Sequence, residues 1–488
     1  RPSCLNLASG LFKKDFGILW EQQGIALRMK MFLNLLRINS ILVAIVGTTM
    51  LMPFLVSFSL HEESRLMLSY LIPMLSGWII LLAVNIPLRK RKINLTIRST
   101  YVTVACAWIF SSLFGAIPIF ASGCSASFTD AFFESCSGFS TTGATIFGEV
   151  QNLPRSMNLW RCLTHWLGGM GIVALTVALL PLLGVGGFQL IKAETTGPEK
   201  GKMTDKITTT AKLLWIIYFV LTAVETIALK IAGMDFIDAI SHSFSTLGTG
   251  GFSSKNASVA GYNSAAIDII ITVFMFLAGI NFSLYFYILT GHWNDVKKNS
   301  ELKAYVAVNL LCILGVSLPL IRIYGGIGSA LRYGSFQALS ISSTSGFATA
   351  DFTVWPSVSQ FFIFLLFFIG GSSGSTSGGF KIIRWVVLFK QLNNETKKIL
   401  HPHGIFTLRL DGSPRDNEIV SVVTSFLVIF FSLIGITTLF GCFANLDILT
   451  AFTGAMSMVG NIGPGFGKLG PLFNYGFLPD FLKWWYCF

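Results

Sequence analysis

Charged side chains are scarce in this sequence. Only 12% of its 488 residues are charged, whereas 53% are hydrophobic and the mean hydropathy is +0.67. An ordinary soluble domain carries about 25% charged residues, so the composition excludes a soluble enzyme or binding domain. The sequence predicts an all-α polytopic membrane protein.

Cysteines are also few, and their spacing shows no regular framework of the kind that disulfide scaffolds or zinc sites require. Cys106, Cys312 and Cys442 lie in apolar runs, where we expect each thiol to act as a small buried hydrophobe. Cys124 and Cys136 both fall on the predicted outer side of the membrane. They could pair, but the sequence does not decide this.

What the sequence has in abundance is apolar runs that suffice to cross roughly 30 Å of hydrocarbon as helices. Nine candidate spans lie at about 39–60, 66–88, 99–121, 158–184, 212–233, 266–290, 303–323, 358–388 and 419–444. The sequence therefore predicts a chain that crosses the membrane many times.

Basic residues gather in the linkers after alternate spans. They are Arg89, Lys90, Arg91, Lys92, Lys192, Lys200, Lys202, Lys206, Lys297, Lys298, Lys390, Lys397, Lys398, Arg409 and Arg415. By the positive-inside rule these linkers face the cytoplasm, and the connections 122–157, 234–262, 324–357 and 445–474 face outward. Because this rule already explains the basic loops, we expect no nucleic-acid partner.

The two ends depart from this pattern. Residues 1–28 are mixed and aperiodic, and we expect them to be disordered or foreign to the fold. At the other end the sequence stops at Phe488, soon after an outward connection. We expect the helix that would close the last unit to be missing.

The four outward connections repeat one pattern. The first contains DAFFESCSGFSTTGAT (130–145) and the second DAISHSFSTLGTGGFS (238–253), each with a glycine thirteen residues after an Asp-Ala pair. YGSFQALSISSTSGFA (333–348) and TAFTGAMSMVGNIGPG (450–465) fit the same register. The aligned residues are Thr141, Thr142 and Gly143; Thr249, Gly250 and Gly251; Thr344, Ser345 and Gly346; and Asn461, Ile462 and Gly463. About ten proline-free residues upstream suit a short re-entrant helix.

These twelve residues have the chemistry of a filter for a monovalent cation. Irregular backbone at membrane depth must be buried in protein or line water, and glycine lets successive carbonyls turn toward one axis. Rings of carbonyls replace the hydration shell of potassium, whereas the absence of an Asp or Glu ring argues against a divalent cation. A single glycine of this kind indicates only a turn, but four in one register predict a potassium filter.

The segments FESCSGFSTTGAT, HWLGGMGIVALTVALLPLLGVGGFQLIKAETTGP, HSFSTLGTGGFS, STSGFATAD and NIGPGFG resemble the TrkH/TrkG/KtrB superfamily of bacterial potassium uptake proteins, from about Met29 to the end. The two spans before the first repeat favour its TrkH branch. The resemblance implies four membrane–pore–membrane units around one pore, preceded by two extra transmembrane helices. It also implies potassium as substrate, no bound cofactor, a homodimer in the bacterial cytoplasmic membrane, and a cytosolic TrkA-like nucleotide-binding ring as regulator.

The sequence departs from that family at the fourth unit. There the family has a closing helix with an arginine that reaches toward the pore, which has no counterpart before Phe488, and Asn461 stands where the other units have threonine. The resemblance divides the chain into an extension (1–28), two transmembrane helices (29–92), repeat 1 (93–190), repeat 2 (207–292), repeat 3 (300–392), a cytoplasmic linker (393–416) and a truncated repeat 4 (417–488).

A second segment, FFIGGSSGSTSGGFK (367–381), interrupts the span 358–388. Its glycine and hydroxyl residues lower helix propensity where a helix would otherwise be needed. We expect a gate loop formed by Gly370, Gly371, Ser372, Ser373, Gly374, Ser375, Thr376, Ser377, Gly378, Gly379 and Lys381. In the resembling family this loop obstructs the pore from the cytoplasmic side, and the regulatory ring would move it through Lys381, Arg384 and the 390–416 linker. A glycine-lined helix-packing seam is the alternative.

Two rival functions remain. Gly371 to Gly374 spell the G-x-S-G of an intramembrane serine protease, but such an enzyme needs a histidine beside Ser373. His165 and His242 are the histidines near membrane segments, and neither has a suitable context, so we expect no enzyme. A potassium symporter coupled to H⁺ or Na⁺ is the nearer alternative. Four loops that enter from the same side favour a channel-like path instead.

Polar residues inside the spans are further candidates. Glu225 could form an interfacial pair with Lys230 or serve as an ion site. We expect Glu134 to anchor its loop by accepting backbone N–H bonds, and Asn281 to hydrogen-bond between helices.

Overall fold

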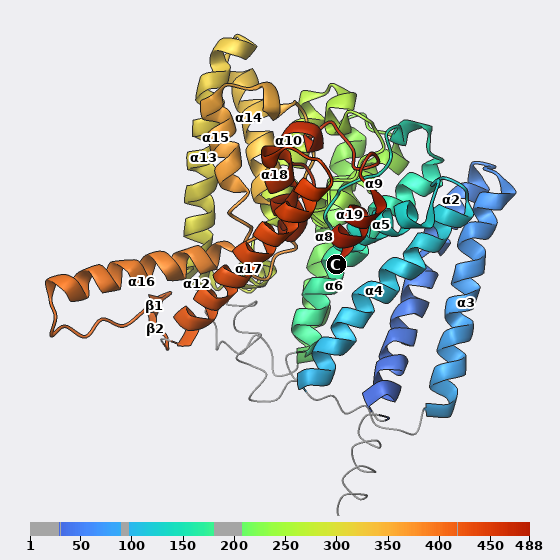
Figure 1. Cartoon of the computed structure of the whole chain (residues 1–488), viewed down its shortest axis with the longest axis horizontal. Coiled ribbons are helices and arrows are strands. Elements are labelled where there is room, and N and C mark those ends of the chain that lie inside the picture. The colour runs from blue at the N-terminus through green and yellow to red at the C-terminus, as the bar shows by residue number, and fades with distance from the viewer. Residues whose placement is uncertain (1–28, 30, 89–96, 180–206, 417) are drawn as a thin grey trace, which may run out of the picture.

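The computed structural model describes residues 29, 31–88, 97–179, 207–416 and 418–488 (Figure 1). The predicted extension 1–28 and most of the basic residues in the first two cytoplasmic linkers lie outside the described residues. Within the described part, strand is limited to a hairpin in which β1 (Arg409–Leu410) pairs antiparallel with β2 (Ser413–Pro414). The predicted all-α class is confirmed.

Two long helices are followed by four units that share one plan. The first helix is Met31–Ser59, whose last third is α2 (Leu51–Ser59), and the next is α3 (Ser64–Leu88). The first unit contains α4 (Ile97–Ala121), α5 (Phe128–Phe139), η1 (Val150–Asn152) and α6 (Arg155–Leu179). The second contains α8 (Ile207–Ile231), α9 (Phe236–Leu247), η2 (Ser258–Tyr262), α10 (Ala265–Ala278), α11 (Phe282–Leu289) and α12 (Trp293–Lys298).

The third unit contains α13 (Ser300–Tyr324), α14 (Ile327–Ser342), η3 (Phe352–Val354), α15 (Ser357–Leu366) and α16 (Ile382–Leu400). The fourth contains α17 (Glu418–Phe443), α18 (Ile448–Gly460), η4 (Gly467–Leu469) and α19 (Asp480–Cys487). In Figure 1, α16 runs sideways away from the helical bundle, with the β hairpin beside it. Each unit thus pairs a long helix with a shorter one, and further helical segments follow the pair.

Six helices in the described ranges are long and apolar enough to cross a membrane, and a bent pair would make a seventh. The predicted span 358–388 is interrupted as expected, because α15 ends at Leu366 and α16 begins only at Ile382. The predicted continuous span 266–290 is wrong. It is two helices, α10 and α11, bent by 92°.

The break between α10 and α11 has local causes. A Cβ on Gly279 would clash with the hydroxyl of Tyr305, so this position can hold only glycine without a shift of its neighbours. Asn281 caps α11 by accepting a hydrogen bond from the backbone N–H of Ser283 at 2.9 Å. The predicted interhelical hydrogen bond of Asn281 is therefore replaced by a cap, which marks a helix start inside the apolar run.

The four units form a closed circle. Each short helix packs on the long helix before it, namely α5 on α4, α9 on α8, α14 on α13 and α18 on α17. Helix α6 contacts both α5 and α9, and α10 contacts both α9 and α14. Helix α16 contacts α17, and α19 at the end of the fourth unit contacts α5 of the first. The short helices are mostly buried within this circle.

The cysteines are free thiols wherever the structure describes them. Cys312 is buried, as predicted, but Cys442 is exposed near the end of α17, which corrects the expectation of a buried thiol there. Cys124 and Cys136 do not pair. Cys136 instead contacts the carbonyl of Cys487 at 3.4 Å.

Candidate functional site

All four short helices end in the same backbone motif. The residue before each aligned glycine donates its N–H to the carbonyl of a serine five residues earlier, at 2.8–2.9 Å, in the pairs Thr142–Ser137, Gly250–Ser245, Ser345–Ser340 and Ile462–Ser457. The intervening residues Thr141, Thr249, Thr344 and Asn461 have φ of 58°, 53°, 57° and 52°. This is a Schellman cap with a left-handed residue after the helix. The four serines are a signal that the sequence analysis missed, although they stand in the same register.

The left-handed residues are informative because of their side chains. Threonine is β-branched, and a positive φ is a true outlier for such residues. Backbone strain of this kind costs roughly 1–3 kcal/mol per residue and clusters at functional sites. Asn461 in the fourth unit is a residue type that tolerates this conformation, so its departure from threonine preserves the backbone.

The aligned glycines close a ring. Their φ values are 79° at Gly143, 80° at Gly251, 77° at Gly346 and 99° at Gly463. A Cβ on each would clash with or crowd a carbonyl oxygen of another unit, in the cyclic order Gly143 to Gly250, Gly251 to Ser345, Gly346 to Ile462 and Gly463 to Thr142. Backbone from all four units therefore meets at van der Waals distance. We call the twelve predicted residues, three from each unit, the filter ring.

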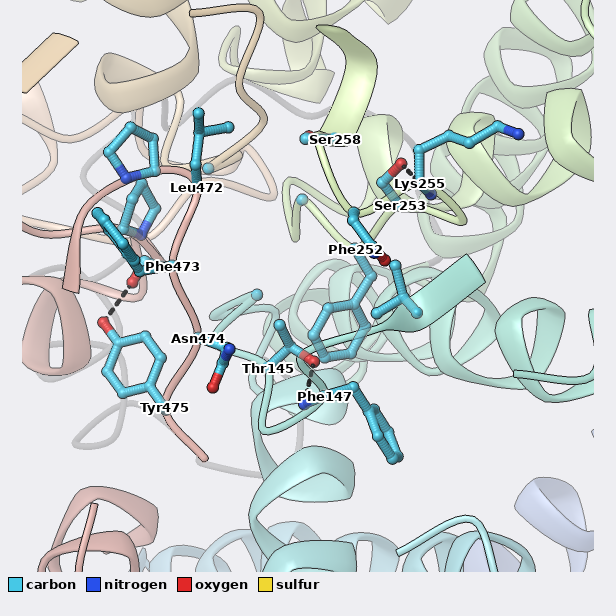
Figure 2. Close-up of a pocket in the computed structure, with 18 of the residues that line it drawn as sticks. Thr145, Phe147, Phe252, Ser253, Lys255, Ser258, Leu472, Phe473, Asn474 and Tyr475 are labelled. Carbon is cyan, nitrogen blue, oxygen red and sulfur yellow. Dashed lines mark hydrogen bonds between the residues drawn. The ribbon is translucent and has the colours of Figure 1, made fainter. Parts of the chain in front are cut away.

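One open pocket lies on the filter ring, and all four glycines line it. Figure 2 shows segments of the first, second and fourth units facing one another across it, with Thr145, Ser253 and Asn474 among the labelled residues. The described residues that line the pocket include no Asp or Glu, and its basic side chains are Arg161 and Lys255. Any cation here would therefore be held by backbone, hydroxyl and side-chain amide oxygens rather than by carboxylates.

Polar side chains behind the filter ring hydrogen-bond to the extended segments that follow it in each unit. Glu134 accepts the N–H of Ile146 at 2.9 Å, which confirms the predicted anchor. His242 hydrogen-bonds Ser253 at 2.9 Å, and Gln337 donates to the carbonyl of Ala350 at 3.0 Å from the same register position. In the fourth unit Thr453 performs this task by accepting the N–H of Phe466 at 2.9 Å.

The sequence analysis missed the partner of Glu134. Arg161 on α6 forms a fully buried ion pair with Glu134 at 2.7 Å, and its guanidinium lies over the ring of Phe252 at 4.3 Å. Arg161 also donates to Thr145 at 3.0 Å and reaches the carbonyl of Ser253 at 3.5 Å. Arg161 and Glu134 thus connect the extended segments that follow the filter ring in the first and second units.

The predicted gate loop lies directly against the filter ring. The N–H of Gly378 donates to the hydroxyl of Thr344 at 2.7 Å, and a Cβ on Gly378 would clash with the carbonyl of Gly460. Lys381 turns back into the loop and donates to the carbonyl of Ser377 at 2.5 Å. We call residues 370–381 the gate loop from here on.

The gate loop also fills the break between α10 and α11. The N–H of Ser372 donates to the carbonyl of Gly279 at 2.9 Å, and the N–H of Phe282 donates to the carbonyl of Gly374 at 3.0 Å. Two interrupted helices from neighbouring units therefore satisfy each other's backbone groups. This exchange explains how irregular backbone is tolerated inside the bundle.

A carboxylate that sequence reasoning missed holds the centre of the gate loop. Glu301, buried in the first turn of α13, accepts the N–H of Ser373 at 2.6 Å and its hydroxyl at 2.9 and 3.0 Å. Next to it, the N–H of Ser300 donates to Asp411 in the β hairpin at 2.6 Å. A continuous series of contacts therefore leads from the hairpin to the gate loop.

These contacts bear on two predictions from the sequence. Ser373 faces Glu301, while His165 hydrogen-bonds Ser245 and His242 hydrogen-bonds Ser253, so the serine–histidine dyad of a protease is not formed. Of the two alternatives for Glu225, the interfacial pair with Lys230 is not formed. Lys230 is exposed, whereas Glu225 is fully buried and neither carboxylate oxygen has a hydrogen-bond partner among the described residues.

Comparisons with known proteins give a consistent result. The family model TrkH, described as a cation transport protein, matches residues 73–310 and 326–475. The Trk system potassium uptake protein TrkH of Vibrio parahaemolyticus serotype O3:K6 is 36% identical over 465 residues, covering 93% of this chain and 94% of that protein. TrkH of Escherichia coli K12 is 37% identical over 408 residues, covering 82% of this chain and 83% of that protein. The crystal structure of the potassium transporter TrkH from Vibrio parahaemolyticus matches with a TM-score of 0.81 and 33% identity, over 93% of this chain and 94% of that chain.

Proposed function

Since the chain belongs to the TrkH family of cation transport proteins, we propose that it takes up potassium through the filter ring. It is a multi-pass protein of the bacterial cytoplasmic membrane. The observation that carries the proposal is the closed cycle in which each of the four glycines meets a carbonyl of another unit.

Potassium suits this ring for a physical reason. Carbonyl dipoles can replace the hydration shell of a monovalent cation, and multi-site coordination of this type is weak enough to let the ion leave again. The pocket on the ring carries no carboxylate among its described lining residues, which disfavours tight binding of a divalent cation. The short helices also direct the negative ends of their dipoles toward the ring.

The gate loop closes the path on the cytoplasmic side. Its contact with Thr344 and its packing on Gly460 support this role, because a segment in that place obstructs an ion that has passed the ring. The alternative of a glycine-lined helix-packing seam predicts that the loop only fills space. Shortening the loop should raise basal flux if it is the gate, and unchanged flux would favour the seam.

A cytosolic nucleotide-binding ring of the TrkA type would move this gate, and the chain would work as a homodimer. The series of contacts from Asp411 through Ser300 and Glu301 to Ser373 supports such coupling, because a partner that pulls on the hairpin also pulls on the gate loop. Cross-linking of the full chain in membranes tests the dimer. Co-purification with a TrkA-type protein tests the ring.

Rescue of growth tests the uptake activity directly. The chain should restore rubidium uptake and growth at low potassium in a cell that lacks its own potassium uptake systems. A chain that reaches the membrane in normal amount without restoring either would contradict the proposal.

A symporter that couples potassium to H⁺ or Na⁺ is a second candidate, and Glu225 is the observation that favours it. A buried carboxyl without a hydrogen-bond partner inside a span is a default candidate for proton transfer. In liposomes a conduit would follow the potassium equilibrium potential regardless of a pH gradient. A symporter would respond to the proton or sodium gradient, and in the proton case Glu225→Gln would abolish that response.

A further inference from the structure

The filter glycine of the fourth unit has a side-chain hydrogen bond that the filter glycines of the other three units lack. The hydroxyl of Tyr475 donates a hydrogen bond of 2.6 Å to the carbonyl of Gly463 (Figure 2). The carbonyls of Gly143, Gly251 and Gly346 accept no such bond from any described residue. Gly463 also has the largest φ of the four, 99° against 77–80°.

Tyr475 is held so that its hydroxyl has little freedom. The residue is 2% exposed, and its own N–H donates to the carbonyl of Thr145 in the first unit at 2.7 Å. Its ring packs against Phe133 with centroids 5.9 Å apart. Tyr475 therefore links Thr145, which follows the filter residues of the first unit, to the filter glycine of the fourth unit.

We propose that Tyr475 is a specificity-determining residue of the filter, which acts by fixing the carbonyl of Gly463. This inference rests on the proposed potassium path. The bond leaves three glycine carbonyls fully available to an ion and shares the fourth with a fixed donor. Without the hydroxyl, the Gly463 carbonyl gains freedom to turn, and a ring with one mobile carbonyl adapts to sodium, which is smaller than potassium.

The segments that follow the four glycines differ in their other side-chain contacts. In the second unit, the thiol of Cys162 contacts the carbonyl of Phe252 at 3.5 Å. In the third unit, the hydroxyl of Ser340 donates to the carbonyl of Phe347 at 2.6 Å. The corresponding hydroxyls of Ser137 in the first unit and Ser457 in the fourth have no hydrogen-bond partner among the described residues, so the bond from Tyr475 to Gly463 is what distinguishes the fourth unit.

The test is Tyr475→Phe, which removes the hydroxyl and keeps the ring. The matched control is Tyr486→Phe, because the Tyr486 hydroxyl is buried beside Tyr475 and has no hydrogen-bond partner in the described part of the chain. Rubidium flux and its inhibition by sodium are measured on the full chain in liposomes. Tyr475→Phe should lower the preference for rubidium over sodium by about fivefold, the factor that corresponds to one lost hydrogen bond, and Tyr486→Phe should leave it unchanged.

The outcomes separate this inference from the proposed function. If Gly346→Ser abolishes the preference and Tyr475→Phe keeps it, only the role of Tyr475 is overturned. If the unaltered chain in liposomes shows no rubidium preference, the potassium path itself is wrong. If Tyr475→Phe does not fold, 3-fluorotyrosine at position 475 supplies a stronger donor in nearly the same volume. An unchanged preference with that residue also overturns the inference.

Discussion

At the scale of single residues, the filter ring depends on positions where the backbone allows few substitutes. Thr141, Thr249 and Thr344 hold a left-handed conformation that β-branched residues avoid. The glycines next to them sit where a Cβ would clash with or crowd a carbonyl of another unit. Strain and crowding of this sort persist only when the surroundings over-determine them, and here the four Schellman caps do so.

The glycines give the first prediction. Gly143→Ser and Gly346→Ser should each abolish the preference for potassium over sodium, because the added side chain displaces a carbonyl of the next unit. Gly435→Ser is the control, since a Cβ there meets nothing within 4 Å. The measurement is rubidium uptake with sodium as competitor. Wild-type preference in both filter variants would show that the ring is assigned to the wrong residues.

The buried pair Glu134–Arg161 gives the second prediction. Glu134→Gln should destabilise the protein by about 3–5 kcal/mol, because it leaves a buried guanidinium without its counter-charge. The control is Arg155→Gln, since the Arg155–Asp235 pair is about half exposed and should be worth roughly 1 kcal/mol or less. Denaturant unfolding in detergent measures both. Equal losses of unfolding free energy in the two variants would show that the buried pair stabilises the protein no more than the exposed pair.

At the scale of elements, the two interrupted helices are best understood together. The break between α10 and α11 offers backbone groups that the gate loop between α15 and α16 satisfies. Neither interruption would be satisfied alone inside a membrane bundle, because each would leave unpaired N–H and carbonyl groups. The gate loop can therefore move only if the break at Gly279 finds other partners.

Glu301 gives the third prediction, at this scale. Glu301→Ala should raise basal potassium flux several-fold in liposomes without any partner protein, because the N–H and the hydroxyl of Ser373 both lose their carboxylate acceptor. Glu395→Ala on α16 is the control, as its pair with Lys398 is about half exposed. Basal flux equal to that of the unaltered chain would mean that Glu301 does not hold the gate.

At the scale of the whole molecule, closure of the circle depends on contacts between the last unit and the first. Lys483 on α19 forms an ion pair of 2.6 Å with Asp130 on α5. Trp484 donates to Thr129 at 3.2 Å, and Tyr475 bridges to Thr145. These contacts span more than 300 positions of sequence, so they join the last unit directly to the first.

The fourth prediction concerns that closure. A double-mutant cycle of Lys483→Met and Asp130→Asn should give a coupling free energy of about 1–3 kcal/mol, because the Lys483 side chain is 5% exposed and Asp130 17%. The same cycle at Lys398 and Glu395 should give less than about 1 kcal/mol. Unfolding in detergent provides both values. A coupling near zero between Lys483 and Asp130 would show that the other contacts between the last and first units, such as those of Trp484 and Tyr475, hold the circle closed.

Local composition and sequence period were enough to predict several features of this protein. Scarce charge and long apolar runs specified a membrane bundle, and the register of Gly143, Gly251, Gly346 and Gly463 located the ring segments. The glycine-rich run 370–381 marked an interruption because helix propensity is a local property. Glu134 was predicted as an anchor from its place in the same register.

Contacts between residues far apart in the chain became visible in the folded protein alone. Arg161 as the partner of Glu134, Glu301 as the holder of Ser373, and Tyr475 as the donor to Gly463 have no periodic signal in the sequence. The break after α10 was also hidden, because its apolar run continues and the hydrogen bonds that compensate for it come from another unit. Hydrogen bonds and ion pairs depend on distances of about 3 Å, and the packing of the whole circle sets those distances.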